Sequence, residues 1–228
     1  MTKATTAFKR LVFFSMLGMM SFVVHAGVAA PGSFSPLKDS TKDKVDNSFR
    51  HIDSRYEVAL ERLKPQADAV KAYIAANNYN TEYVFLIDMS IPSGKKRFFI
   101  YNLKTDQIIE SALVTHGFGS RVRGSDESLQ FSNEASSLQT SLGRYKIGSS
   151  YNGNFGLSYK LFGLDKTNSN AYARAIVIHA HKSIPTTEIY PVLIGESFGC
   201  PSVAPSFLDT LTKYIKGSSK PVMMWIYN

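Results

Sequence analysis

The stretch Val222-Met223-Met224-Trp225-Ile226-Tyr227 decides the fold class of this chain. All six residues are apolar or aromatic, and no polar residue alternates with them. A strand with one face in water shows such alternation, whereas a strand that is covered on both faces does not need it. The stretch therefore predicts a β-strand with other parts of the protein packed on both of its faces.

Further runs of β-branched and aromatic residues precede this strand, separated by turn signals such as Pro92-Ser93-Gly94. The runs cover residues 83–87, 97–103, 108–115, 144–151, 157–164 and 175–184. One helix is expected at about residues 205–215, just before the last strand. The main domain is therefore predicted to be mainly β, a sandwich or barrel with a helix docked on it.

The residues before this domain have a helical pattern instead. Apolar residues recur at helical spacing through residues 42–63, and Pro65 is expected to end or break that helix. A second helix is expected over residues 66–76. We interpret residues 42–80 as a small helical hairpin packed on a domain of residues 81–228, with a flexible lead-in at 27–41.

The first residues have the pattern of a signal for export. Lys3, Lys9 and Arg10 precede an apolar run at residues 11–24, and Val24-His25-Ala26 offers a cleavage site. The run is about 14 residues long, whereas a membrane span needs about 20. We therefore expect residues 1–26 to be a cleaved signal peptide, with no stable transmembrane segment afterwards and a location in the periplasm or cell envelope.

The charge of the chain suits a polyanionic partner such as a cell wall or membrane surface, or simply solubility. The formal charge is +8, and it falls to +5 without the signal because three basic residues and no acidic ones are lost. Basic charge is the main feature that favours nucleic-acid binding, and we expect none.

The single cysteine, Cys200, lies in the stretch "GESFGCPSV" of residues 195–203. One cysteine cannot form an internal disulfide, so it is an intermolecular link, an inert buried side chain or a nucleophile. A nucleophilic thiol needs a base or cation beside it. Gly199 would let the backbone approach a substrate carbonyl, and the expected helix after Cys200 would favour an anionic sulfur at its positive end.

Histidines are the available bases. In "AIVIHAHKSI" at residues 175–184, His179 and His181 share one face of an extended strand because alternate side chains point the same way. His116, in "VTHGFGS", lies in a turn rich in glycine. These three histidines and Cys200 are also a possible zinc-ligand set.

Several of these motifs together resemble the murein L,D-transpeptidases, in the YkuD-type branch with a Gly-Cys-Pro motif. The resemblance rests on "IVIHAHKSIP" followed by "GESFGCPSV", and it extends upstream over about residues 80–228. The other matching stretches are "VTHGFGS", "FSNEASSLQTSLGRYKIG", "YNGNFGLSYKLFGL" and "NSNAYARAIVIHAH".

The resemblance implies roles for individual residues. It makes Cys200 the nucleophile and His179 the base, with His181 as the second candidate base, and it places Gly199 in the catalytic turn. His181, Ser197, His116 and Arg174 are candidates for substrate binding. Two departures from the family pattern, Phe198 in place of a histidine and Pro201-Ser202 after the cysteine, put the binding of acidic substrate groups in doubt.

The implied reaction is acyl transfer between peptidoglycan stem peptides, without a cofactor. Cys200 would attack a tetrapeptide stem, release D-alanine and form a thioester, and an amine of a neighbouring stem would then form a 3-3 cross-link. The resemblance also implies inactivation by carbapenems. Three alternatives remain open, namely an L,D-carboxypeptidase with water as acceptor, a zinc-dependent wall peptidase and a wall-binding protein without catalysis.

Overall fold

The computed structural model describes residues 58, 61–122 and 125–228. The predicted signal peptide, the lead-in and nearly all of the predicted helix at 42–63 lie outside these residues. No helix in the described part of the chain has the length and hydrophobicity that crossing a membrane requires.

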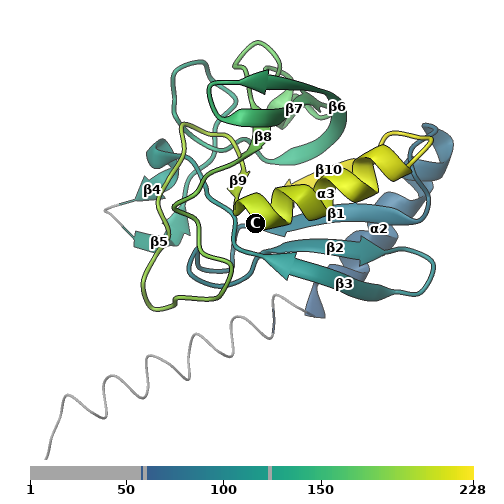
Figure 1. The fold of residues 1–228 in the computed structure, drawn as a ribbon, viewed down its shortest axis with the longest axis horizontal. Helices are drawn as coiled ribbons and strands as arrows, with labels where there is room; N and C mark the ends of the chain where they lie inside the picture. The colour runs from purple at the N-terminus through teal and green to yellow at the C-terminus, as the bar shows by residue number, and fades with distance from the viewer. Residues whose placement is uncertain (1–57, 59–60, 123–124) are drawn as a thin grey trace, which may run out of the picture. The chain divides into compact units, whose positions relative to one another are not determined.

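Eight strands form one mixed sheet in the order β3-β2-β1-β10-β6-β7-β8-β9, which confirms the prediction of a mainly β fold (Figure 1). The strands are β1 Tyr83–Asp88, β2 Phe98–Asn102, β3 Gln107–Ala112, β6 Gly143–Gly153, β7 Gly156–Gly163, β8 Val177–Ala180, β9 Ser202–Val203 and β10 Met223–Tyr227. Two short strands, β4 Arg121–Val122 and β5 Ser125–Leu129, form a separate hairpin. Two 3-10 turns are η1 Phe118–Ser120 and η2 Lys166–Asn168.

Strand β10 lies inside the sheet, parallel to β1 and antiparallel to β6. Met223 and Tyr227 pack into one hydrophobic core, whereas Met224 and Ile226 pack into the other. Both faces of the strand are therefore covered, as its unbroken apolar sequence predicts.

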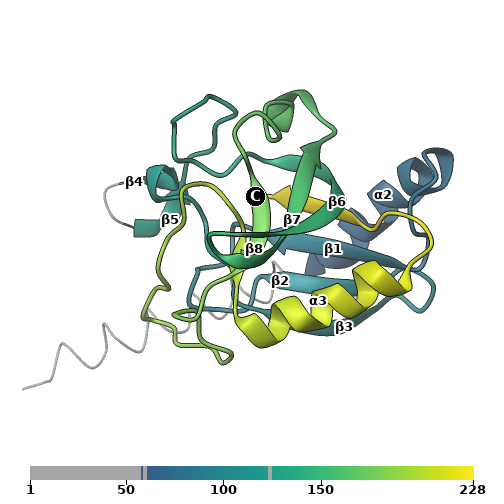
Figure 2. The same cartoon turned by 45° about the horizontal axis from the view of Figure 1, so that its top comes forward.

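Helix α2, Leu63–Ala76, covers one face of the sheet behind β1 and β10 (Figures 1 and 2). Leu63, Ala67, Val70 and Ile74 are buried and recur at the spacing of one helical face. The helix begins three residues earlier than predicted, with Pro65 inside its first turn, where the missing N–H of proline has no intrahelical partner to lose.

Helix α3, Pro205–Gly217, lies on the opposite face of the sheet (Figure 2). Phe207, Leu208 and Leu211 are buried in the core on that face, and the ring of Phe207 meets that of Phe98 edge-on at 5.1 Å. Helix α3 follows β9 directly, so the cysteine turn lies just before the strand and helix that fix its end.

Strand β8 is shorter than the predicted run at 175–184, because the chain turns after Ala180. In that turn the Ile184 N–H donates to the His181 carbonyl at 3.1 Å. Strand β9 pairs in parallel with β8, and this register sets Ser202 directly beside His179. Two distant segments of the sequence thereby meet at the edge of the sheet.

Candidate active site

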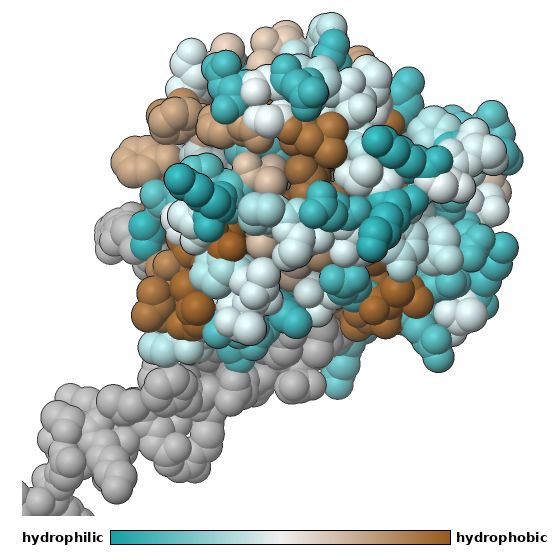
Figure 3. Space-filling view, in the orientation of Figure 1, coloured by the Kyte–Doolittle hydropathy of each residue, from teal (hydrophilic) through white to brown (hydrophobic). Residues whose placement is uncertain are grey.

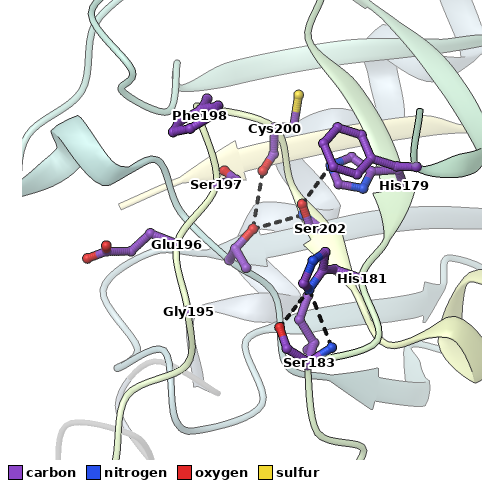
Figure 4. Close-up of a pocket in the computed structure, with 12 residues that line it drawn as sticks. His179, His181, Ser183, Gly195, Glu196, Ser197, Phe198, Cys200 and Ser202 are labelled. Carbon is purple, nitrogen blue, oxygen red and sulfur yellow. Dashed lines mark hydrogen bonds between the residues drawn. The ribbon is translucent and has the colours of Figure 1, made fainter. Parts of the chain in front are cut away.

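A cavity of about 210 Å³ opens where the cysteine turn meets the end of β8 (Figure 4). Of the predicted site residues, Cys200, His179, His181 and Ser197 line it. Figure 4 shows Cys200 and His179 towards one end, with His181 further along. Four of the seven predicted site residues therefore lie together, while Gly199, His116 and Arg174 are not among the residues that line this cavity.

Thr115 holds the backbone at the cysteine and just after it. Its hydroxyl donates to the Cys200 carbonyl at 3.2 Å and accepts from the Ser202 N–H at 2.9 Å. The Thr115 N–H in turn donates to the Ser202 carbonyl at 3.0 Å. Since the Cys200 carbonyl and both backbone groups of Ser202 are bonded to one buried residue, the fold sets the course of the chain at and after Cys200.

Ser197 shapes the turn before the cysteine. Its N–H donates to the His116 carbonyl at 2.9 Å, and its carbonyl accepts from the Phe118 N–H at 2.7 Å. Its hydroxyl accepts from the Gly199 N–H at 3.1 Å and also lies 3.2 Å from the His116 carbonyl. Ser197 is thus both a turn-forming residue and part of the cavity wall.

Gly199 has a backbone conformation that favours glycine, with φ of +112°. A Cβ at this position would lie 2.8 Å from the Gln139 carbonyl oxygen and 3.3 Å from Arg174 Nη2. The turn can therefore place the cysteine against the loop that contains Gln139 only because residue 199 has no side chain.

The Cys200 thiol is bonded to backbone groups at the start of β8. The Val177 N–H donates to Sγ at 3.4 Å, and Sγ lies 3.8 Å from the Ala175 carbonyl oxygen. Burial raises the pKa of the thiol, and the Val177 N–H and the charge of Arg174 oppose that rise. Because burial dominates, the resting cysteine is a neutral thiol.

His179 is nearly fully buried, and both of its ring nitrogens are bonded. Nδ1 lies 3.0 Å from the Ala180 carbonyl oxygen, and Nε2 lies 2.9 Å from the Ser202 hydroxyl. A carbonyl can only accept, so Nδ1 is protonated and Nε2 holds the lone pair of the neutral ring. Burial lowers the pKa of His179, which keeps the ring neutral and able to accept a proton.

Phe155, at the β6–β7 turn, covers the ring of His179. The two rings are stacked at 4.2 Å with an angle of 18° between their planes. This contact and the hydrogen bond to Ser202 fix the imidazole plane. The structure thus adds Thr115, Ser202 and Phe155 to the site. Each lies in a stretch that carries the family resemblance, but none of them has a predicted role in the site.

His181 lies beyond the end of β8 and is exposed. Its Nδ1 is 2.6 Å from the Ser183 hydroxyl and also accepts the Ser183 N–H at 3.3 Å. His181 therefore shares the cavity with His179, but it lies past the end of the strand, is bonded within its own turn and lacks the burial of His179.

Arg174 holds a loop rather than facing the cavity. Its guanidinium donates to the carbonyls of Ser132 at 2.8 Å and Gln139 at 2.6 Å, and lies 3.3 Å from the Ser137 hydroxyl. These bonds fix the loop against which Gly199 turns. Arg174 therefore supports the shape of the site in this structure.

His116 is 1% exposed, and its ring faces a buried arginine. Arg97 donates to His116 Nδ1 at 2.9 Å and to the Val114 carbonyl at 3.0 and 2.9 Å. The positive charge of the guanidinium disfavours a metal cation at this nitrogen. Among the described residues, no group of three or more His, Cys, Asp or Glu side chains is placed to hold a metal ion.

A comparison with protein families identifies the chain. The sequence profile described as the L,D-transpeptidase catalytic domain matches residues 56–227. The chain belongs to this family. The match includes α2 as well as the whole sheet, so the L,D-transpeptidase domain of this protein contains both hydrophobic cores.

Solved structures with similarity to this L,D-transpeptidase domain include three bacterial proteins. An L,D-transpeptidase of Xylanimonas cellulosilytica has 12% identity and a TM-score of 0.37, covering 64% of this chain and 60% of its own. Bd1075 of Bdellovibrio bacteriovorus has 19% identity and a TM-score of 0.40, and the match covers 64% of this chain and 48% of Bd1075. The helical cell shape determining protein Pgp2 of Campylobacter jejuni has 12% identity and a TM-score of 0.42, and the match covers 64% of this chain and 48% of Pgp2.

The chain spans less than two thirds of the length of each of these structures. No curated protein sequence matches it significantly.

Proposed function

We propose that this protein is an exported cysteine acyltransferase that acts on the tetrapeptide stems of peptidoglycan and forms 3-3 cross-links. The observation that carries the proposal is the presence of Cys200 and His179 in one cavity of an L,D-transpeptidase catalytic domain. The predicted signal at residues 1–26 supports export to the compartment that holds the wall.

The first step is attack on the carbonyl between the diamino acid and the terminal D-alanine. Because burial keeps both the thiol and the imidazole neutral at rest, His179 acts as a general base and not as one half of a standing ion pair. The Cys200 S–H proton passes to His179 Nε2 as the S–C bond forms. The thiol displaces the Ser202 hydroxyl from Nε2 for this step.

The protonated His179 then gives its proton to the leaving amine, so D-alanine departs and the stem remains as a thioester on Cys200. An amine of a neighbouring stem attacks the thioester and forms the cross-link, and the thiol is regenerated. The hydrogen bond from His179 Nδ1 to Ala180 keeps the ring oriented through both proton transfers.

The absence of a hydrogen bond between Cys200 and His179 among the described residues fits a resting enzyme. Catalytic hydrogen bonds in proteins without substrate are often long, and they tighten only when substrate binds. Both side chains line the same cavity, and Cys200 lies two residues before Ser202, which pairs with His179 between β9 and β8.

Product analysis tests the function. The mature protein is incubated with a purified disaccharide-tetrapeptide, and mass spectrometry follows D-alanine, cross-linked dimer and hydrolysed product. Dimer in the wild type and none in Cys200→Ala is the expected result. D-alanine loss without dimer would make the protein an L,D-carboxypeptidase. No product from either protein would indicate a wall-binding protein without catalysis, and equal product from both would show that Cys200 is not the nucleophile.

A further inference from the structure

We propose that five side chains on β6, β7 and the segment after η2 form a binding surface for the sugar strand that carries the stem peptides. This surface, the tyrosine strip, consists of Lys146, Tyr151, Lys160, Phe162 and Tyr172. The proposal rests on the proposed function, because it assigns a second part of the same peptidoglycan substrate to a second part of the protein.

The register of the sheet places the strip on the same face as His179. Tyr151 on β6 pairs with Ser158 on β7, which pairs with His179 on β8. Directly paired residues of antiparallel strands point to the same face. Lys160 and Phe162 follow Ser158 at steps of two and therefore share that face. The strip is thus continuous with the catalytic histidine across β7.

Two glycines make the rings of this face lie flat. A Cβ on Gly148 would lie 2.4 Å from the ring of Phe162, and a Cβ on Gly153 would lie 2.8 Å from the ring of Tyr151. Each ring therefore covers backbone where any side chain would push it away. The exposed ring of Tyr172 lies over that of Phe162, at 5.1 Å between the ring centroids and with only 10° between the planes.

The two tyrosines of the strip are exposed, while its two lysines and Phe162 are half-buried. Tyr172 is 58% exposed and Tyr151 is 41% exposed. The Lys160 Nζ lies 5.9 Å from both tyrosine ring centroids, and the Lys146 Nζ lies 5.2 Å from that of Phe162. Hydrophobic residues reach the face shown in Figure 3 only in patches on a mainly polar surface. The exposed tyrosine rings add aromatic area that a ligand can cover.

A wall sugar strand has the chemistry that this surface fits. The C–H faces of its rings pack on flat aromatic rings, while the lysines can bind the carboxylates of the attached stems. Single-stranded nucleic acid also binds aromatic and cationic surfaces. The wall strand is favoured because the strip adjoins His179, where the stem peptide of such a strand would have to enter.

Binding of sugar strands without peptides tests this inference directly. The probe is wall glycan from which an amidase has removed the stems, and the protein is the mature chain with Cys200→Ala to prevent turnover. We expect the double variant Tyr151→Ala/Tyr172→Ala to bind about tenfold more weakly or worse, as expected for loss of exposed aromatic contacts. Tyr151→Phe/Tyr172→Phe keeps the flat rings and should retain binding.

Two controls complete the experiment. Ile108→Ala/Ile109→Ala removes exposed apolar groups from β3 and should not change glycan binding. Thermal unfolding confirms that each variant is folded. Equal binding by the alanine double variant would overturn the proposal, as would binding only when stems are present, or equal binding of a thymidine oligonucleotide. D-alanine release by the wild type is measured separately, so loss of the proposed activity and loss of the sugar site are distinguished.

Discussion

Burial acts on Cys200 and His179 in opposite directions. It raises the pKa of the thiol and lowers the pKa of the imidazole, because the charged form of each group loses solvation. A ready-made thiolate is therefore not stabilised in the resting site. The thiol is instead protected until a substrate lies beside it and His179 can take its proton.

The first prediction concerns His179→Gln, which should slow acylation of Cys200 by about 10²- to 10⁴-fold, the usual contribution of a general base. In the wild type, the acylation rate should fall with decreasing pH only below pH 6.5, because His179 must be neutral and its pKa is lowered from 6.5. A stopped-flow pH profile measures this. A larger loss in His181→Gln would assign the base to the other histidine.

Ser202→Ala tests how the imidazole is positioned. Without the hydroxyl at Nε2, His179 keeps its bond to Ala180 but loses the contact that fixes the other end of the ring. We expect roughly a tenfold lower kcat with little change in KM. Ser183→Ala is the matched control because its hydroxyl contacts only His181 among the cavity histidines. An equal loss in both variants would refute a specific role for Ser202.

Gly199→Ala should damage the site by strain. The alanine Cβ would lie 2.8 Å from the Gln139 oxygen at a backbone φ of +112°, which should cost about 1–3 kcal/mol in unfolding free energy. Chemical denaturation measures the cost. Gly195→Ala is the control, since a Cβ there meets nothing within 4 Å. Similar stability of the two variants would contradict the close approach of the turn.

The residue types of the site were predictable from the sequence, but the partners of Arg174 and His116 were not. Arg174 was predicted to bind substrate because guanidinium pairs well with carboxylates. In the fold, the Arg174 guanidinium donates hydrogen bonds to carbonyls of a loop that is distant in the sequence. His116 likewise faces Arg97, which lies 19 positions earlier in the chain, directly before β2. Such partners are set by tertiary packing, which local sequence does not encode.

At the scale of elements, α2 packs closely on the sheet. Its buried residues share a core with β1, β2 and β10. We predict that Ile74→Ala lowers the unfolding free energy by about 2–5 kcal/mol, as a buried large-to-small change does. Ala72→Ser, on the exposed side of α2, should have little effect in the same denaturation experiment. Equal effects would show that the packing of α2 is not stabilising.

The long strands follow from sequence because their side chains alternate or form apolar runs, as in β1 and β10. Strand β9 does not follow from the sequence, because its two residues form a strand only by pairing with His179 and Ala180. The end of β8 was also missed, because Ile184 is apolar like a strand residue but bonds back to His181 in a turn.

At the scale of the molecule, the two cores hold the sheet rigid between α2 and α3, and the site lies where β8 and β9 extend the edge of that sheet. Functional groups placed on rigid elements keep their geometry better than groups on free loops. The turn with Cys200 gains the same rigidity from Thr115 and from its direct connection to β9 and α3.

The most direct test of the account is the intact mass of the protein during turnover of the disaccharide-tetrapeptide. We expect a covalent adduct with the mass of the stem donor after loss of D-alanine, and peptide mapping should place it on Cys200. His179→Gln should form the same adduct far more slowly. An adduct on another residue, or turnover in Cys200→Ala, would contradict the account.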